Sequence, residues 1–240
     1  MLSYVKISEW GEFSSLSKNR KQTKKQTQAQ PTSAISPMMI GVVAAAAVLV
    51  VVGLIILGNQ SRASEPFEVS QFPALGDANA PVTFIEFSDY GCSHCRDFAL
   101  GTFSQLEADY INTGKVRYIV HPFNLGYPEL ALATEAAWCA QDQGDYFAYH
   151  HTLYENQGLV AYNQVALTDL AASIGLDQTA FAQCLSNHTH QADVEKARQA
   201  AANRGINSTP TFFINNQRVN GNQPYEVFQR LIEQELAISQ

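Results

Sequence analysis

The sequence predicts an α/β domain with an inserted block of helices, preceded by one N-terminal transmembrane helix. Three patterns carry this prediction: an uncharged apolar stretch at 38–58, a strand–helix–strand pattern at 82–120, and a strand–strand–helix pattern from 211 onward. Strands that alternate with helices favour parallel pairing with a right-handed crossover. The 240 residues suffice for one globular domain and an anchor.

The stretch 38–58 is the predicted membrane anchor. It contains no charged residue, and at about 1.5 Å per helical residue it spans roughly 30 Å, the thickness of a bilayer's hydrocarbon core. The alternative is a cleaved signal peptide, with a cleavage site at Ser61-Arg62-Ala63. A signal peptide has a shorter apolar region that lies nearer the start of the chain. The 37 residues before this stretch therefore favour an anchor that is retained.

Basic residues predict the orientation of the anchor. The flank that follows it carries Arg62, whereas the flank before it carries Lys18, Arg20, Lys21, Lys24 and Lys25. The positive-inside rule then places residues 1–37 in the cytoplasm and the rest of this single-pass cell-membrane protein outside it. The cytoplasmic tail 1–37 is expected to be disordered, because it has few large apolar side chains to bury.

The part beyond the membrane is acidic. Residues 1–62 hold 7 of the 15 Lys and Arg and 2 of the 22 Asp and Glu, which leaves 8 basic and 20 acidic residues, a net charge near −12. Nucleic acid and anionic lipid would be repelled by such a surface. The charge therefore excludes nucleic acid as a partner and leaves protein substrates open.

Residues 59–80 are predicted to be a linker because they are rich in turn-forming residues, with one short edge strand at Phe67–Val69. The globular domain follows at 81–240. It begins with a short β-rich apolar strand at Val82–Phe87, typical of a sheet buried on both faces. A helix at Cys92–Tyr110 and a strand at Val116–Val120 complete a βαβ unit.

A block of helices is expected from about 128 to 205, with interruptions at Gly144, Gly158 and Gly175. After this insert the chain is predicted to close with two strands and a helix, at 211–214, 218–219 and 224–237.

The motif Cys92-Ser93-His94-Cys95 stands at the join of the first strand and the following helix. The unpaired N–H groups and the dipole of a helix N-terminus stabilise a thiolate, which is the form that attacks disulfides. Two intervening residues bring the second sulfur within bonding reach of the first. The motif predicts thiol–disulfide exchange, with Cys92 as the nucleophile and Cys95 as the resolving thiol. His94 can add positive charge or a hydrogen bond, which favours an oxidising pair.

The pair has two alternative interpretations: a buried or structural cysteine pair, and half of a zinc site. A zinc site needs about four ligands, usually a second cysteine or histidine pair. No such partner occurs at a suitable spacing, so neither a metal nor a cofactor is predicted. His188 and His190 are expected to be solvated, and three further histidines to be structural or on the surface: His121, His150 and His151.

Glu86 is an acid in an otherwise apolar strand, six residues before Cys92. Burial would raise its pKa and suit it to proton transfer with the second thiol, whereas the alternative is a side chain that faces solvent.

Thr209-Pro210 directly precedes the strand that starts at Thr211. Proline has no backbone N–H to donate to a neighbouring strand, so a proline there marks a cis peptide bond or a sheet edge. The sequence alone leaves this choice open.

Cys139 and Cys184 are the other two of the four cysteines. In an oxidising compartment two remaining thiols tend to pair, which favours a structural disulfide between them. The alternative is two separate buried cysteines.

Several segments together resemble one family. They are Leu75–Thr83, Glu86–Tyr90, Cys92–Cys95 and the later segments 136–140, 144–147, 181–185 and 205–214. The combination is similar to the DsbA-like family of the thioredoxin superfamily, in particular to its membrane-anchored BdbD-like branch. The resemblance extends over about residues 72–237.

The resemblance implies a thioredoxin fold with a helical insertion, a nucleophilic Cys92, a resolving Cys95 and an acid at Glu86. It also implies a cis bond before Pro210, in a groove where Thr209 and Pro210 bind unfolded polypeptide by main-chain contacts. Ser93, beside the nucleophile, is counted with these substrate-binding residues and stands where classical members carry proline. Reoxidation in such systems comes from a quinone-coupled membrane partner of the DsbB or VKOR type.

The leading hypothesis is an extracytoplasmic dithiol oxidase that introduces disulfides into exported proteins with reduced cysteines. A disulfide reductase or isomerase of the same fold is the alternative within this class, and it would need a supply of electrons. From another class, an anchored metal-handling or binding protein could use the two thiols and His94 as ligands. Sequence leaves the direction of electron flow open, because reduction potential depends on small differences in thiolate stabilisation.

Overall fold

The computed structural model describes Val42, residues 46–54 and residues 69–239. Val42 and residues 46–54 are helical and belong to one unit of the chain, 1–55, whereas the second unit, 56–240, contains the sheet. Within the described ranges, no helix combines the length and the apolar character needed to cross a bilayer. The predicted tail 1–37 and most of the predicted anchor 38–58 lie outside the described residues.

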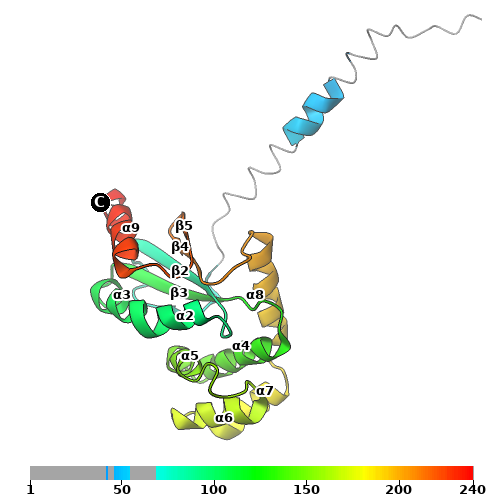
Figure 1. Ribbon diagram of the computed structural model, residues 1–240, viewed down its shortest axis with the longest axis vertical. Helices are drawn as coiled ribbons and strands as arrows, with labels where there is room; N and C mark the ends of the chain where they lie inside the picture. Colours follow the sequence, from blue (N-terminus) through cyan, green and yellow to red (C-terminus); the bar gives the residue numbers. More distant parts are fainter. Residues whose placement is uncertain (1–41, 43–45, 55–68, 240) are drawn as a thin grey trace, which may run out of the picture. The chain divides into compact units, whose positions relative to one another are not determined.

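A mixed five-stranded sheet with the order β1-β3-β2-β4-β5 is the centre of the second unit (Figure 1). β2 (Val82–Ser88) and β3 (Val116–Pro122) run parallel, which confirms the predicted βαβ unit. Antiparallel pairing adds the other three strands, β1 (Ala74–Leu75), β4 (Thr211–Ile214) and β5 (Gln217–Asn220).

The short edge strand lies inside the predicted linker, further along the chain than expected. It is β1, whose Ala74 pairs with Ile119 of β3, whereas the sequence suggested Phe67–Val69. Of that range only Val69 is described, and it is not in a strand. Pairing with the free edge of β3, rather than local β-propensity, decides where such a short strand forms.

A continuous helical rod connects β2 to β3. It covers the range predicted as one helix, but two of its four segments, η1 and η2, have π-type hydrogen bonding. The segments are α2 (Ser93–Asp97), η1 (Phe98–Thr102), α3 (Phe103–Leu106) and η2 (Glu107–Ile111).

Five helices between β3 and β4 form the insert predicted at about 128–205. Gly144 and Gly175 end two of these helices with positive φ angles of 87°, which favour glycine. The insert consists of α4 (Pro128–Gln141), α5 (Tyr146–Glu155), α6 (Gln164–Ser173), α7 (Gln178–Ser186) and α8 (Gln191–Asn203). Figure 1 shows α4 to α7 grouped beside the sheet and α8 leading back towards β4. The chain closes with α9 (Tyr225–Ile238).

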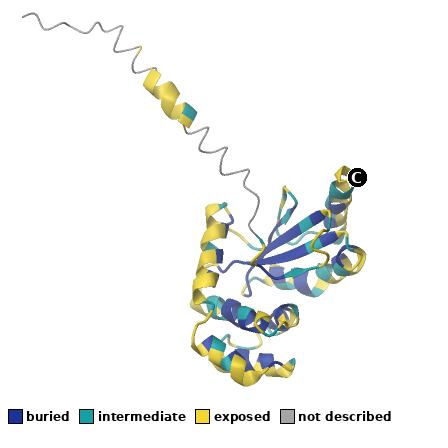
Figure 2. Cartoon of the chain, turned by 180° about the vertical axis from the view of Figure 1, so that it is seen from behind, coloured by how far each residue is buried: buried dark blue, intermediate teal, exposed yellow. Residues whose placement is uncertain are grey.

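The pleat of β2 and β3 divides the core into two clusters, one on each face of the sheet. On one face Ile85 and Ile119 pack with Ala197 and Ala201 of α8. On the other face, Phe84, Tyr118 and Val120 pack with residues of α2, η1 and α9, including Cys95, Phe98 and Phe228. Figure 2 shows the buried residues concentrated in the sheet and on the helix surfaces that face it. Because Glu86 follows Phe84 by two residues in β2, its side chain points to the same face as Cys95.

Candidate active site

Cys92 and Cys95 lie at the N-terminus of the helical rod, as the sequence predicts. Cys92 is the N-cap residue of α2, with an extended backbone, and Cys95 lies in the first turn. Cys92 is half-buried and Cys95 is fully buried, and both are free thiols. Solvent and a partner protein can therefore reach Cys92, whereas Cys95 is enclosed by the core.

The pKa of Cys92 is lowered to about 6. The largest cause is a hydrogen bond from the Cys95 thiol; interactions with Thr209 and with the backbone N–H groups of Cys95 and His94 add to it, against the opposing effect of burial. The Cys95 thiol and the two backbone N–H groups are donors, which stabilise the negative sulfur at the helix N-terminus. Cys92 is therefore mostly a thiolate at neutral pH.

The pKa of Cys95 is raised far above that of a free thiol. Burial is the main cause, followed by the hydrogen bond that Cys95 donates to Cys92 and by the negative charges of Glu86 and Cys92. The pKa values of the two thiols in one motif are thus shifted in opposite directions. Cys95 needs a nearby proton acceptor before it can react as a thiolate.

Glu86 is fully buried, so the solvent-facing alternative is wrong. In the sheet it lies between Val120 of β3 and Phe212 of β4, neither of which offers a polar side chain. The Tyr118 hydroxyl donates a hydrogen bond to its Oε2, and Oε1 has no partner among the described residues. Burial raises the pKa of Glu86 to about 8, against the opposing effect of the Tyr118 hydrogen bond.

His94 and Ser93 are both exposed at the start of α2. The His94 side chain is 72% exposed, and its Nδ1 lies 4.0 Å from Oδ2 of Asp97. Its contribution to the Cys92 thiolate comes from the backbone N–H. Of the two contributions that the sequence suggests for His94, positive charge or a hydrogen bond, the structure shows the hydrogen bond, and it comes from the main chain.

The loop before β4 brings Thr209 and Pro210 to the dithiol. The Thr209–Pro210 peptide bond is cis. In its protonated form the Cys92 thiol donates a hydrogen bond of 3.2 Å to the carbonyl oxygen of Thr209, across 117 positions in the chain. Pro210 is buried beside this contact.

Sequence reasoning missed two side chains that fix the turn before Cys92. Asp89, which is buried, accepts hydrogen bonds from the backbone N–H groups of Gly91 at 2.7 Å and Leu125 at 2.8 Å. The side-chain amide of Gln157 donates to the carbonyl oxygens of Tyr90 at 2.7 Å and Cys92 at 3.1 Å. An Asp two residues before Gly is a local turn signal, but nothing near Gln157 in the sequence indicates its role.

The helical insert also contacts this turn through a buried histidine. His150 of α5 makes a hydrogen bond of 2.8 Å through Nδ1 with the hydroxyl of Tyr90. Burial lowers the pKa of His150 to about 3 and that of His121, a buried residue of β3, to about 4, so both are neutral at physiological pH. His151 is exposed. The two buried histidines are structural, in line with the sequence interpretation.

Cys139 of α4 and Cys184 of α7 are joined by a disulfide. Beside it both His188 and His190 pair with carboxylates of the α4 region. The expectation that these histidines are solvated is right for His188, whose side chain is 53% exposed, and wrong for His190. His188 Nδ1 lies 3.0 Å from Glu135 Oε2, and His190, whose side chain is only 14% exposed, lies 2.8 Å from Asp142. The polar helical spacing did not reveal that α4 packs against this segment.

In the described part of the chain, one group of potential metal ligands has its donor atoms within 4.8 Å of one another: Cys139, Cys184 and His190. Both sulfurs of that group are used by the disulfide. The group does not include Cys92 or Cys95.

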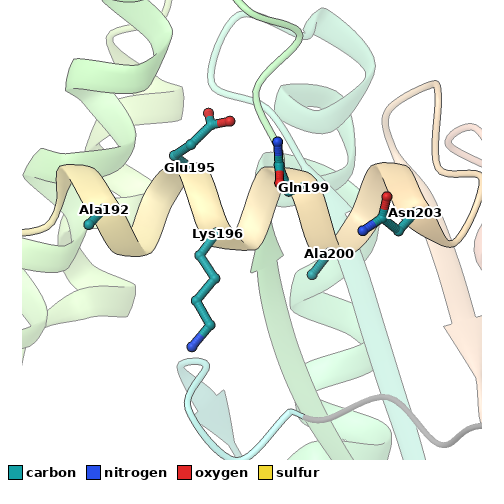
Figure 3. Close-up of a pocket in the computed structure, with 6 residues that line it drawn as sticks. All are labelled: Ala192, Glu195, Lys196, Gln199, Ala200 and Asn203. Carbon is teal, nitrogen blue, oxygen red and sulfur yellow. The ribbon is translucent and has the colours of Figure 1, made fainter.

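A surface hollow lies along α8 (Figure 3). It shares no lining residue with the site around Cys92, and its lining residues are Ala192, Glu195, Lys196, Gln199, Ala200 and Asn203.

One accessible thiolate and one buried, protonated thiol make this site suited to thiol–disulfide exchange. The sheet, the helix that starts at the dithiol and the adjoining cis-proline define the class, the thiol–disulfide oxidoreductases of the thioredoxin fold. A family model described as Thioredoxin matches residues 69–234. The chain belongs to the DsbA-like thiol–disulfide oxidoreductases of the thioredoxin superfamily.

Three comparisons support this assignment. Disulfide bond formation protein D of Bacillus subtilis is 30% identical over 186 residues, which cover 75% of this chain and 83% of the relative. The crystal structure of oxidised BdbD from Bacillus subtilis has a TM-score of 0.66 and 27% identity, over 73% of this chain and 97% of that one. Wolbachia pipientis alpha-DsbA1 has a TM-score of 0.65 and 26% identity, over 72% and 94%.

Proposed function

We propose that this oxidoreductase is a dithiol oxidase that introduces disulfides into exported proteins through Cys92 and Cys95. The observation that carries the proposal is the lowered pKa of Cys92, about 6. A stabilised thiolate stabilises the reduced form of the pair, and the disulfide form becomes a stronger oxidant as a result. A relative that matches most of the chain is named a disulfide bond formation protein, which supports this direction.

The proposed reaction starts from a Cys92–Cys95 disulfide. A substrate thiolate attacks the sulfur of Cys92, a substrate–Cys92 disulfide forms, and Cys95 leaves as a thiolate. A second substrate thiolate then attacks the substrate sulfur of this mixed disulfide, and Cys92 leaves as the stable thiolate. The substrate loses two electrons, and the enzyme's pair gains them.

Glu86 is proposed to exchange a proton with Cys95 in this reaction. When Cys95 leaves as a thiolate in a buried site, its high pKa requires a proton, and a protonated Glu86 supplies it. In reoxidation the same carboxylate takes the proton back. A carboxyl group whose pKa is near the working pH can act in both directions.

Substrate is proposed to bind beside Cys92 as an extended polypeptide. The main chain at Thr209 and Pro210 adjoins the nucleophile, and Ser93 is exposed next to it. Two loops that are hydrogen-bonded to the Asp89–Cys92 turn expose apolar side chains nearby. These are Leu125, Tyr127 and Leu159, which are 51%, 60% and 77% exposed. Such apolar groups favour contact with unfolded chains over folded polar surfaces.

The domain is proposed to act outside the cytoplasm, as a single-pass membrane protein with residues 38–58 as the anchor and residues 1–37 in the cytoplasm. The uncharged stretch and its basic N-terminal flank support this orientation. The Cys139–Cys184 disulfide is in keeping with an oxidising compartment. A quinone-coupled membrane protein of the DsbB or VKOR type would reoxidise the pair.

The reduction potential of the Cys92–Cys95 pair tests this proposal. The full-length chain is equilibrated with glutathione buffers, and the oxidised fraction is measured by thiol labelling. An oxidase is expected to have a reduction potential of about −120 mV. A value of about −270 mV, as in thioredoxin, would overturn the oxidase direction and favour a reductase.

Metal analysis of the purified chain checks the metal-handling alternative, which requires stoichiometric metal that is lost in Cys92→Ser.

A further inference from the structure

Tyr118 holds one oxygen of the Glu86 carboxyl group and leaves the other free. Its hydroxyl donates to Oε2, whereas Oε1, which is inaccessible to solvent, meets no hydrogen-bond partner in the described part of the chain. Both side chains are buried. A buried oxygen without a hydrogen-bond partner destabilises the folded protein. The presence of such an atom at a reactive site therefore indicates a role in the reaction.

The sheet register brings these two side chains together. Tyr118 pairs with Phe84 across the parallel strands, and Glu86 pairs with Val120, so Tyr118 and Glu86 are diagonal neighbours on one face. The ring of Tyr118 also packs against Phe103, with 4.7 Å between ring centroids. The position of the hydroxyl is therefore fixed by packing within the core.

The titratable groups that face Glu86 come from three elements. They are Cys92 and Cys95 at the start of α2, Tyr118 of β3, and Tyr146 and Tyr154 of α5. The three phenols have raised pKa values, mainly because of burial, and stay neutral. None of the five groups is a cation, so a hydrogen bond, not an ion pair, stabilises the ionised Glu86.

We propose that Tyr118 is a positioning residue, which binds Oε2 of Glu86 so that Oε1 is the atom that exchanges a proton with the Cys95 sulfur. The inference rests on the proposed role of Glu86 as the proton acceptor. Oε2 can accept the Tyr118 hydrogen bond in both protonation states of Glu86, but the bond is stronger to the carboxylate. Tyr118 thus limits how far burial raises the pKa of Glu86.

The step in question occurs when Cys95 resolves a mixed disulfide on Cys92. The S–H bond of Cys95 breaks, and its proton moves to Oε1 of Glu86. The Cys95 thiolate attacks the sulfur of Cys92, the Cys92–Cys95 bond forms, and the bond from Cys92 to the partner sulfur breaks. The partner leaves as a thiolate and carries away the two electrons that the pair loses.

The pH dependence of this step tests the proposal. The reduced full-length chain is mixed with excess 5,5′-dithiobis(2-nitrobenzoate), which forms a mixed disulfide with Cys92, and the second release of thionitrobenzoate reports the attack by Cys95. Tyr118→Phe removes a hydrogen bond to a charged group, so the pH midpoint should rise by about one unit, and the rate at neutral pH should fall about tenfold.

Tyr149→Phe is the matched control. Tyr149 is also fully buried, and its hydroxyl donates a hydrogen bond of 2.8 Å to the carbonyl oxygen of Leu167. This variant should keep the wild-type midpoint. Fluorotyrosine inserted at position 118 provides a second test that preserves the packing. Its more acidic hydroxyl donates a stronger hydrogen bond, so the midpoint should move downward.

Glu86→Gln separates the failure of the inference from the failure of the proposed function. If Glu86→Gln abolishes the pH dependence but neither change at Tyr118 moves the midpoint, the positioning role is overturned and the proton-transfer role of Glu86 stands. If Glu86→Gln leaves the profile unchanged, both are overturned. The inference is supported if the pH midpoint rises in Tyr118→Phe and falls with fluorotyrosine at position 118. In addition, Tyr118→Phe should cause no further change when it is combined with Glu86→Gln.

Discussion

The sulfur of Cys92 lies 3.2 Å from the carbonyl oxygen of Thr209, although 117 positions separate the two residues in the chain. One residue starts the helix after β2 and the other precedes β4, which pairs with β2 in the sheet. The contact places the main chain of the cis-proline loop beside the nucleophile. A polypeptide that approaches Cys92 therefore meets backbone hydrogen-bonding groups, which recognise any sequence.

The first prediction concerns the thiolate of Cys92. The reduced full-length chain should show a thiolate absorbance with a midpoint near pH 6, which is absent in Cys92→Ser. Because the pKa in the folded state is lower than in the unfolded state, the added stability is present at high pH. It should be lost as pH falls towards about 6 and below. A midpoint near that of a free thiol would contradict the stabilisation of the thiolate by the Cys95 thiol and the backbone N–H groups.

The second prediction is that Glu86→Gln stabilises the reduced protein at alkaline pH. The pKa of Glu86 is raised in the folded state to about 8 from 4.5, so wild-type stability falls as pH rises through this range. Glutamine keeps an acceptor for Tyr118 and cannot ionise. We expect a gain of about 1–3 kcal/mol above pH 8 after the cost of an unpaired amide is subtracted. Denaturant unfolding at pH 5 and pH 9 should show the gain only at the higher pH.

The third prediction concerns the Cys139–Cys184 disulfide. The double variant Cys92→Ser, Cys95→Ser should contain no free thiol under non-reducing conditions, measured by mass labelling; two free thiols would contradict the pairing. Replacing Cys139 and Cys184 by alanine should lower the free energy of unfolding by about 2–4 kcal/mol, because the bond closes a long loop. The thiolate midpoint of Cys92 should not change in that variant.

The fourth prediction concerns the glycine before the nucleophile. A Cβ atom at Gly91 would lie 2.7 Å from the side chain of Leu130 in α4. Gly91→Ala should therefore destabilise the protein by about 1 kcal/mol, because Leu130 must move. Gly101→Ala is the control: nothing lies within 4 Å of its added Cβ, and helix propensity favours alanine. Equal thermal stability of the two variants would contradict close packing at Gly91.

Local patterns in the sequence were sufficient for the βαβ unit, the helical insert and the closing strands and helix. The apolar strand Val82–Phe87 and the helix that follows it predict a parallel βαβ unit, because strand and helix periodicities differ and the crossover has a preferred hand. Two cysteines three positions apart at a helix start predict exchange chemistry, since the N-terminal dipole acts on residues of the first turn. These inferences depend on neighbours in the chain.

Only the tertiary structure decided which distant groups meet the dithiol. Burial of Glu86 depends on helices that cover one face of the sheet, and its bond to Tyr118 depends on the register of two strands. Gln157, which follows the C-terminal end of α5, donates a hydrogen bond to the carbonyl oxygen of Cys92, and no local pattern predicts that contact. Spacing within a short motif determines what the two thiols of Cys92 and Cys95 can do. Packing between remote elements determines their pKa values, because desolvation and hydrogen bonding depend on what surrounds a group in space.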